Sequence, residues 1–138
     1  MRIIFLNQDP TTARIPRTVI CHYAQRIERF LGRRARNAEL SVIFVTSKRS
    51  RELNTRYRGK KKPTNVLSFE TDDCATTFGD ILICPAVARR EAEEQEILLT
   101  DWLVHLFVHG ALHLFGYDHV RALDERRMSR LEQTILKK

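Results

Sequence analysis

Three histidines stand close together in the last third of the sequence, at positions 109, 113 and 119. His109 and His113 are four residues apart in an apolar segment, and residues at this spacing share one face of an α-helix. Gly116 can adopt the left-handed conformation that ends a helix and turns the chain back, which would bring His119 to the same point. Three imidazoles and one water form an open, catalytic zinc site. The pattern therefore predicts one zinc ion per chain, bound by His109, His113 and His119, although imidazole also suits other transition metals.

The histidine pair could also be a packed pair without a metal. Burying several polar rings in an apolar segment is costly unless something satisfies their hydrogen-bonding groups, which favours a metal site.

Other histidines and one acidic residue of the chain have more than one interpretation. His105, one helical turn upstream, is a fourth ligand, a partner of a ligand or a core histidine. We favour the structural role because a catalytic zinc needs an open position. Asp118 is a turn residue or orients a ligand imidazole, and the isolated His22 is structural or on the surface.

The histidine spacing also matches the motif H-E-x-x-H-x-x-G-x-x-H of the metzincin proteases, with one difference. Gly110 stands where those proteases have the glutamate that acts as general base on the zinc-bound water. Met128 lies on a predicted helix and is more simply a core residue than the methionine of their conserved turn. A zinc peptidase with a substitute base is therefore the weaker alternative.

The positive charge is concentrated in one segment, residues 48–62. The whole chain has a formal net charge of +7, and this segment, with eight basic residues and one acidic residue, carries all of it. The basic residues are Lys48, Arg49, Arg51, Arg56, Arg58, Lys60, Lys61 and Lys62. A local positive patch on an otherwise neutral chain is typical of nucleic-acid binding. A solvated basic face or a contact with anionic lipid is the alternative.

Length and composition favour one domain over residues 1–138, and nothing suggests a linker or a repeat. No apolar stretch has the length of a membrane helix or of a secretory signal, so we expect a cytoplasmic protein without a membrane partner. Cys21, Cys74 and Cys84 are odd in number and form no C-x-x-C motif. They predict reduced thiols rather than a disulfide framework, a disulfide-linked partner or a cysteine zinc site.

The periodicity of apolar residues predicts an α+β fold: a small mixed sheet of about four strands packed with about five helices. The expected strands cover residues 2–6, 40–45, 66–69 and 80–84, with a polar connection over 71–78. The expected helices cover residues 16–31, 47–58, 85–96 and 101–115, followed by a last helix with Met128, Leu131 and Ile135 on its apolar side. We expect Thr46 or Ser47 to cap the second helix and Thr100 to cap the fourth.

Three blocks of the sequence resemble one known family. The run H-G-x-L-H-L-x-G-Y-D-H over 109–119 looks like the signature of the YbeY family, bacterial single-strand-specific endoribonucleases that mature ribosomal RNA. Residues 53–69 are similar to the same family's L-N-x-x-[YF]-R-x-K-x-x-P-T-[DN]-V-L-S-F, and Gly79-Asp80-Ile81 fits its G-D-I block. Glu70 stands where members commonly have proline.

This resemblance implies a metzincin-like zinc site with His109, His113 and His119 as ligands, and an essential arginine at Arg58. It implies cleavage of ribosomal RNA, in 16S rRNA 3′-end maturation and ribosome quality control, with the small ribosomal subunit as partner. Arg58 can pair bidentately with the scissile phosphate, or else cap the end of its helix.

The nucleophile is a zinc-activated water or the RNA 2′-hydroxyl, and both alternatives stay open. Asp80, Glu70 and Asp118 are weak candidates for a general base. A non-catalytic ribosome-assembly factor with structural zinc is the second alternative function.

Overall fold

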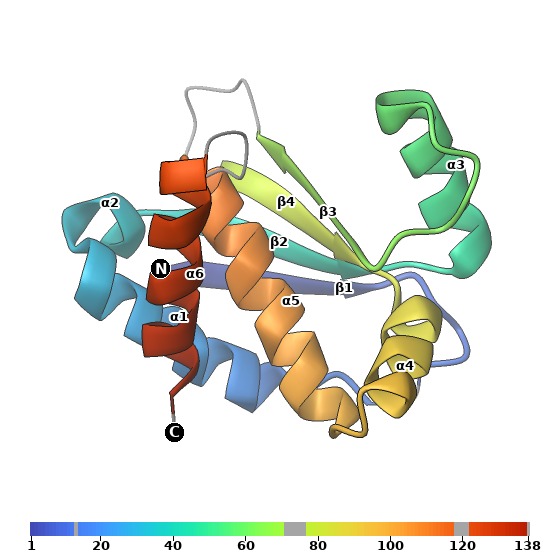
Figure 1. Ribbon diagram of the computed structural model, residues 1–138, viewed down its shortest axis with the longest axis horizontal. Helices are drawn as coiled ribbons and strands as arrows, with labels where there is room; N and C mark the ends of the chain where they lie inside the picture. Colours follow the sequence, from blue (N-terminus) through green and yellow to red (C-terminus); the bar gives the residue numbers. More distant parts are fainter. Residues whose placement is uncertain (13, 71–76, 118–121, 138) are drawn as a thin grey trace.

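A four-stranded mixed β-sheet forms one layer of the protein (Figure 1). The computed structural model describes residues 1–12, 14–70, 77–117 and 122–137. The strands are β1 (Arg2–Asn7), β2 (Glu39–Phe44), β3 (Val66–Glu70) and β4 (Thr77–Ile83), in the order β1-β2-β4-β3. β1, β2 and β4 are parallel, whereas β3 is an edge strand antiparallel to β4. The four predicted strands are confirmed, except that β4 begins three residues early and shortens the expected connection.

The described part of the chain contains six helices, one more than predicted. They are α1 (Arg17–Leu31), α2 (Arg33–Arg36), α3 (Ser47–Arg58), α4 (Pro85–Glu94), α5 (Leu99–Leu114) and α6 (Ala122–Leu136). The single turn α2 was too short to show a periodic pattern. The prediction that Thr100 caps α5 is wrong, because α5 begins at Leu99 after Leu98, which provides no side-chain cap.

Helix α5 lies across one face of the sheet, and α1 and α6 pack beside it (Figure 1). Alternate residues of β2, Leu40, Val42 and Phe44, are fully buried on this face. The apolar side predicted for the last helix is confirmed, because Met128 and Ile135 are fully buried against the same core. Two of the three predicted ligands, His109 and His113, therefore lie on the central helix of the fold, where packing on several sides fixes its position.

Helix α3 stands apart from α1, α5 and α6 (Figure 1) and carries most of the basic segment. The side chain of Thr46 accepts a hydrogen bond from the backbone N–H of Arg49, at 3.1 Å, as the capping prediction requires. Gly59 ends the helix in the left-handed conformation, with φ 68°. The bounds of α3 thus follow from its two terminal residues.

No single helix within the described ranges is long and apolar enough to cross a membrane. The pair α4 and α5 meets the length and composition criteria only when taken together, across a bend of 117°. Of the three cysteines, Cys84 is buried and Cys21 is half-buried. Cys74 lies outside the described residues.

Candidate active site

Two of the three predicted ligands, His109 and His113, converge on α5. Their Nε2 atoms lie 3.0 Å apart, and the rings meet edge to face with centroids 4.5 Å apart. Both side chains are partly exposed, although most of the residues around them on α5 are buried. The spacing of four residues therefore does place both imidazoles on one face of the helix, at an opening in the core.

A carboxylate that the sequence analysis missed holds one of these rings. Glu132 of α6 is only 8% exposed, and its Oε1 lies 2.6 Å from Nδ1 of His109. A hydrogen bond from Nδ1 to a carboxylate leaves the lone pair on Nε2, the usual arrangement in a histidine that binds a metal through Nε2; here that atom is within hydrogen-bond distance of Nε2 of His113. The available signal was a charged residue within the apolar side of the last helix, between Leu131 and Ile135.

His105 occupies a different environment from His109 and His113. Its ring stacks on Trp102, with centroids 4.8 Å apart, and its Nε2 lies 4.0 Å from Oε2 of Glu132. Burial lowers the pKa of His105 below its ordinary value, and this outweighs the opposite effect of the Glu132 carboxylate. It lines a pocket with Tyr23 and Trp102 rather than the one that contains the other two histidines.

Arg58 lines the same pocket as the two histidines. The pocket lies between the end of α3, the edge strand β3 and α5, and is bounded by Arg58, Val66, Ser68, His109 and His113. Arg58 and the histidines are separated by about fifty residues in the sequence, so the fold alone brings them together. A guanidinium beside paired imidazoles can bind and stabilise an anionic group such as a phosphate.

The packing of α5 on the sheet explains the glycine that follows His109. A Cβ at Gly110 would lie 2.9 Å from Cγ2 of Ile81, closer than Cβ atoms approach other atoms in real proteins, and 3.0 Å from Oγ of Ser68, which is tighter than most Cβ contacts. The hydroxyl of Ser68 also donates a hydrogen bond to the Gly110 carbonyl, at 3.1 Å. A metzincin-like glutamate has no room at this position, which counts against peptidase chemistry.

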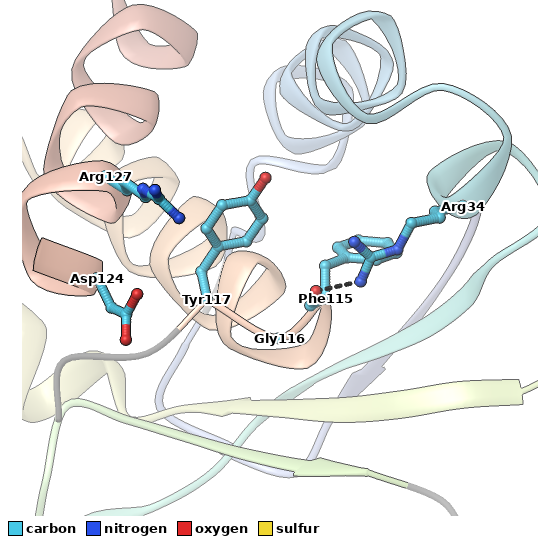
Figure 2. A pocket seen from close by; sticks show the side chains of 6 residues that line it. All are labelled: Arg34, Phe115, Gly116, Tyr117, Asp124 and Arg127. Carbon is cyan, nitrogen blue, oxygen red and sulfur yellow. Dashed lines mark hydrogen bonds between the residues drawn. The ribbon is translucent and has the colours of Figure 1, made fainter. Parts of the chain in front are cut away.

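The chain bends after α5 as predicted. Gly116 has φ 95°, and its N–H donates to the carbonyl of His113 at 3.0 Å. Figure 2 shows the pocket beyond the bend, where Arg34 donates to the carbonyl of Phe115, and Tyr117 lies between Arg34 and Arg127. His119 and Asp118, the third predicted ligand and a candidate orienting residue, lie outside the described residues.

Within the ranges that the structure describes, no three His, Cys, Asp or Glu side chains gather closely enough to hold a metal ion. The pair of His109 and His113 nevertheless fits two positions of such a site. The two Nε2 atoms are at hydrogen-bond distance, 3.0 Å, and two zinc–nitrogen bonds of roughly 2.0–2.1 Å in tetrahedral geometry place the nitrogens roughly 3.3 Å apart, so a small separation of the rings would admit one metal ion. The residues present therefore suit a metal that takes further ligands from elsewhere.

All eight basic residues of the segment 48–62 are exposed. Five belong to α3 and three to the loop that follows, which is tied back to the helix. The buried amide of Asn54 donates to the carbonyl of Lys62 at 2.8 Å, and Thr64 exchanges hydrogen bonds with Ser50. The sequence alone shows where this charge is concentrated, but the contacts that position the lysine loop are seen only in the structure.

Two of the candidate general bases, Asp80 and Glu70, are not among the residues that line the histidine pocket. Asp80 is on β4 between Gly79 and Ile81, which both face α5, so its side chain points to the opposite face of the sheet. Glu70 is exposed at the end of β3 and does not line the pocket that contains the two histidines. The described residues thus offer Glu132 as the carboxylate next to the histidines, in a role that orients a ring.

The fold and the pocket together define an α+β protein with paired histidines and an arginine at one candidate site, next to a basic helix. Comparison with known proteins specifies this further. The family model described as Endoribonuclease YbeY matches residues 7–138, and the chain belongs to this family.

Two curated relatives and one solved structure illustrate the similarity. The Endoribonuclease YbeY of Bordetella petrii is 52% identical over 101 residues, which cover 72% of this chain and 65% of the relative. That of Pseudoalteromonas translucida is 42% identical over 103 residues, covering 72% and 68%. The match thus spans about two thirds of these relatives. The solution structure of TM1509 from Thermotoga maritima superposes with a TM-score of 0.66, at 24% identity over 98% of this chain and 87% of that one, which shows a common fold.

Proposed function

We propose that this protein is a zinc-dependent, single-strand-specific endoribonuclease that acts on ribosomal RNA. Its place would be the cytoplasm, in 16S rRNA 3′-end maturation and ribosome quality control, with the small ribosomal subunit as partner. The observation that carries the proposal is the pocket shared by Arg58, His109 and His113. Membership of the Endoribonuclease YbeY family supports the same activity.

His109 and His113 would hold the zinc ion together with His119. When bound, zinc polarises a phosphoryl oxygen and lowers the pKa of bound water. Glu132 orients His109 through Nδ1, and Arg58 neutralises negative charge on the scissile phosphate. The exposed basic side chains of α3 and of the lysine loop bind phosphates of the RNA backbone on either side of the cleaved bond, without reading the RNA sequence.

The test measures metal content and RNA cleavage in the wild type, His113→Ala and Arg58→Ala. We expect about one zinc per wild-type chain, loss of both zinc and cleavage in His113→Ala, and loss of cleavage with normal zinc content in Arg58→Ala. The matched controls are His22→Ala and Arg29→Ala, which remove an exposed histidine and an exposed arginine of α1. Both controls should behave as the wild type.

The alternatives give different results. A zinc peptidase would cleave a peptide pool and leave RNA intact. An assembly factor with structural zinc would bind precursor ribosomal particles equally well after chelation and would not cleave above the His113→Ala background. That variant also detects contaminating ribonucleases, because their activity would survive the substitution.

A further inference from the structure

An aromatic ring is exposed in the middle of the basic segment. Tyr57 of α3 is 57% exposed, and its ring contacts Phe69 of β3, with centroids 4.9 Å apart and ring planes at 60°. The guanidinium of Arg56 lies 5.4 Å from the Tyr57 ring centroid, within the range of a cation–π contact. The two rings thus offer an apolar surface that is flanked by cations and open to solvent.

The residues that carry these two rings are sequence neighbours of residues that line the histidine pocket. Arg58 and Ser68 both line the pocket. Tyr57 directly precedes Arg58 in the sequence, and Phe69 directly follows Ser68. Ser68 faces α5, where it bonds to Gly110, and successive residues of a strand point to opposite faces. Phe69 and the Tyr57 ring packed on it therefore lie on the other face of the edge strand β3, so an RNA strand that crosses this edge would meet both the pocket and the rings.

We propose that Tyr57 and Phe69 form a stacking platform for an unpaired base of the RNA strand whose phosphate lies at Arg58. This inference rests on the proposed function and specifies its substrate. Unpaired bases stack on exposed aromatic rings with little regard to sequence, and nearby arginines add cation–π and phosphate contacts. A base inside a duplex is already stacked, so the platform selects single strands.

The opposing possibility is that Tyr57 only packs α3 against β3. Two substitutions separate the roles, because Tyr57→Phe keeps the flat ring, whereas Tyr57→Leu keeps an apolar side chain and removes the ring. We expect the affinity for a single-stranded RNA oligonucleotide to fall roughly 5- to 100-fold in Tyr57→Leu and to stay near the wild-type value in Tyr57→Phe. The affinity for a duplex of the same sequence should be the same in all three proteins.

A probe of the stack itself completes the experiment. An oligonucleotide that contains the fluorescent base 2-aminopurine should be quenched on binding to the wild type and Tyr57→Phe, and less quenched at saturation with Tyr57→Leu. The melting temperatures of the variants control for folding. If Tyr57→Leu binds and quenches the single strand as the wild type does, the platform is refuted.

The failure of the platform and that of the proposed function are distinguishable. If the wild type cleaves RNA, and Tyr57→Leu binds single-stranded RNA and quenches 2-aminopurine as the wild type does, only the platform is refuted. A wild type that neither binds nor cleaves single-stranded RNA refutes the proposed function, and the platform with it.

Discussion

The contact between Glu132 and His109 makes a prediction at the scale of single residues. Because a carboxylate on Nδ1 fixes the tautomer and orientation of a metal-binding imidazole, Glu132→Ala should weaken zinc binding by the metal-free protein roughly 10- to 100-fold. Glu132→Gln keeps an acceptor for the Nδ1 hydrogen and should lose less. Competition with a chelator of known affinity measures the zinc affinity of both variants. Equal zinc affinity in the wild type, Glu132→Ala and Glu132→Gln would contradict the orienting role.

Asp9, far from the histidines in sequence, makes a second residue-scale prediction. Its carboxylate accepts hydrogen bonds from the N–H and hydroxyl of Thr11 and from the hydroxyl of Thr12, at 2.7–3.0 Å. Burial raises the pKa of Asp9, but these bonds together outweigh it and hold the pKa below its ordinary value of 3.8. A lowered pKa in the folded state means that the ionised carboxylate stabilises the fold.

The stabilisation by Asp9 is complete above the ordinary pKa and is lost as the pH falls through the lower folded-state value. Asp9→Ala should therefore reduce the free energy of unfolding by roughly 1–3 kcal/mol at neutral pH. The difference between the two proteins should shrink as the pH falls below that ordinary value. Urea unfolding of both proteins, from neutral pH to below the ordinary pKa of Asp9, measures this difference in the free energy of unfolding. A difference that does not vary with pH would count against stabilisation by the ionised carboxylate.

At the scale of elements, the close approach of α5 to the sheet depends on Gly110. Alanine is intrinsically better than glycine in a helix by about 1 kcal/mol. At this position its Cβ would collide with Ile81 and Ser68, and such overpacking typically costs about 1–3 kcal/mol. We expect Gly110→Ala to lower the free energy of unfolding despite the gain in helix propensity.

The double variant Gly110→Ala, Ser68→Ala tests the cause of this loss. Removing the Ser68 hydroxyl opens space, so part of the stability lost in Gly110→Ala should return in the double variant, relative to Ser68→Ala alone. Denaturant titration of the four proteins gives the coupling between the two positions. A Gly110→Ala protein as stable as the wild type would mean that α5 shifts freely on the sheet.

At the scale of the whole molecule, the sequence predicted what periodicity and terminal residues encode. The four strands, α3 between Thr46 and Gly59, and the pairing of His109 with His113 follow from local patterns. Contacts across the fold carry no such pattern. Neither the hydrogen bond from His109 to Glu132 nor the pairing of Tyr57 with Phe69 could be derived from the sequence, because each joins elements whose relative placement depends on tertiary packing.

The uneven distribution of charge makes a prediction for the whole molecule. The segment 48–62 carries the entire net charge, with three lysines in the loop that Asn54 and Ser50 tie to α3. If this loop contacts RNA phosphates, each contact adds about 0.7 to the slope of log affinity against log salt for a single strand. Replacing Lys60, Lys61 and Lys62 with alanine should then flatten the slope by up to about 2.

The control removes the same charge elsewhere. Arg29, Arg126 and Arg130 are exposed on α1 and α6, and their replacement with alanine changes the net charge equally. If the field of the whole protein governed binding, both triple variants would flatten the salt dependence alike. Because we expect direct contacts at the lysine loop, only the loop variant should change the slope strongly, and equal slopes would place the RNA elsewhere on the protein.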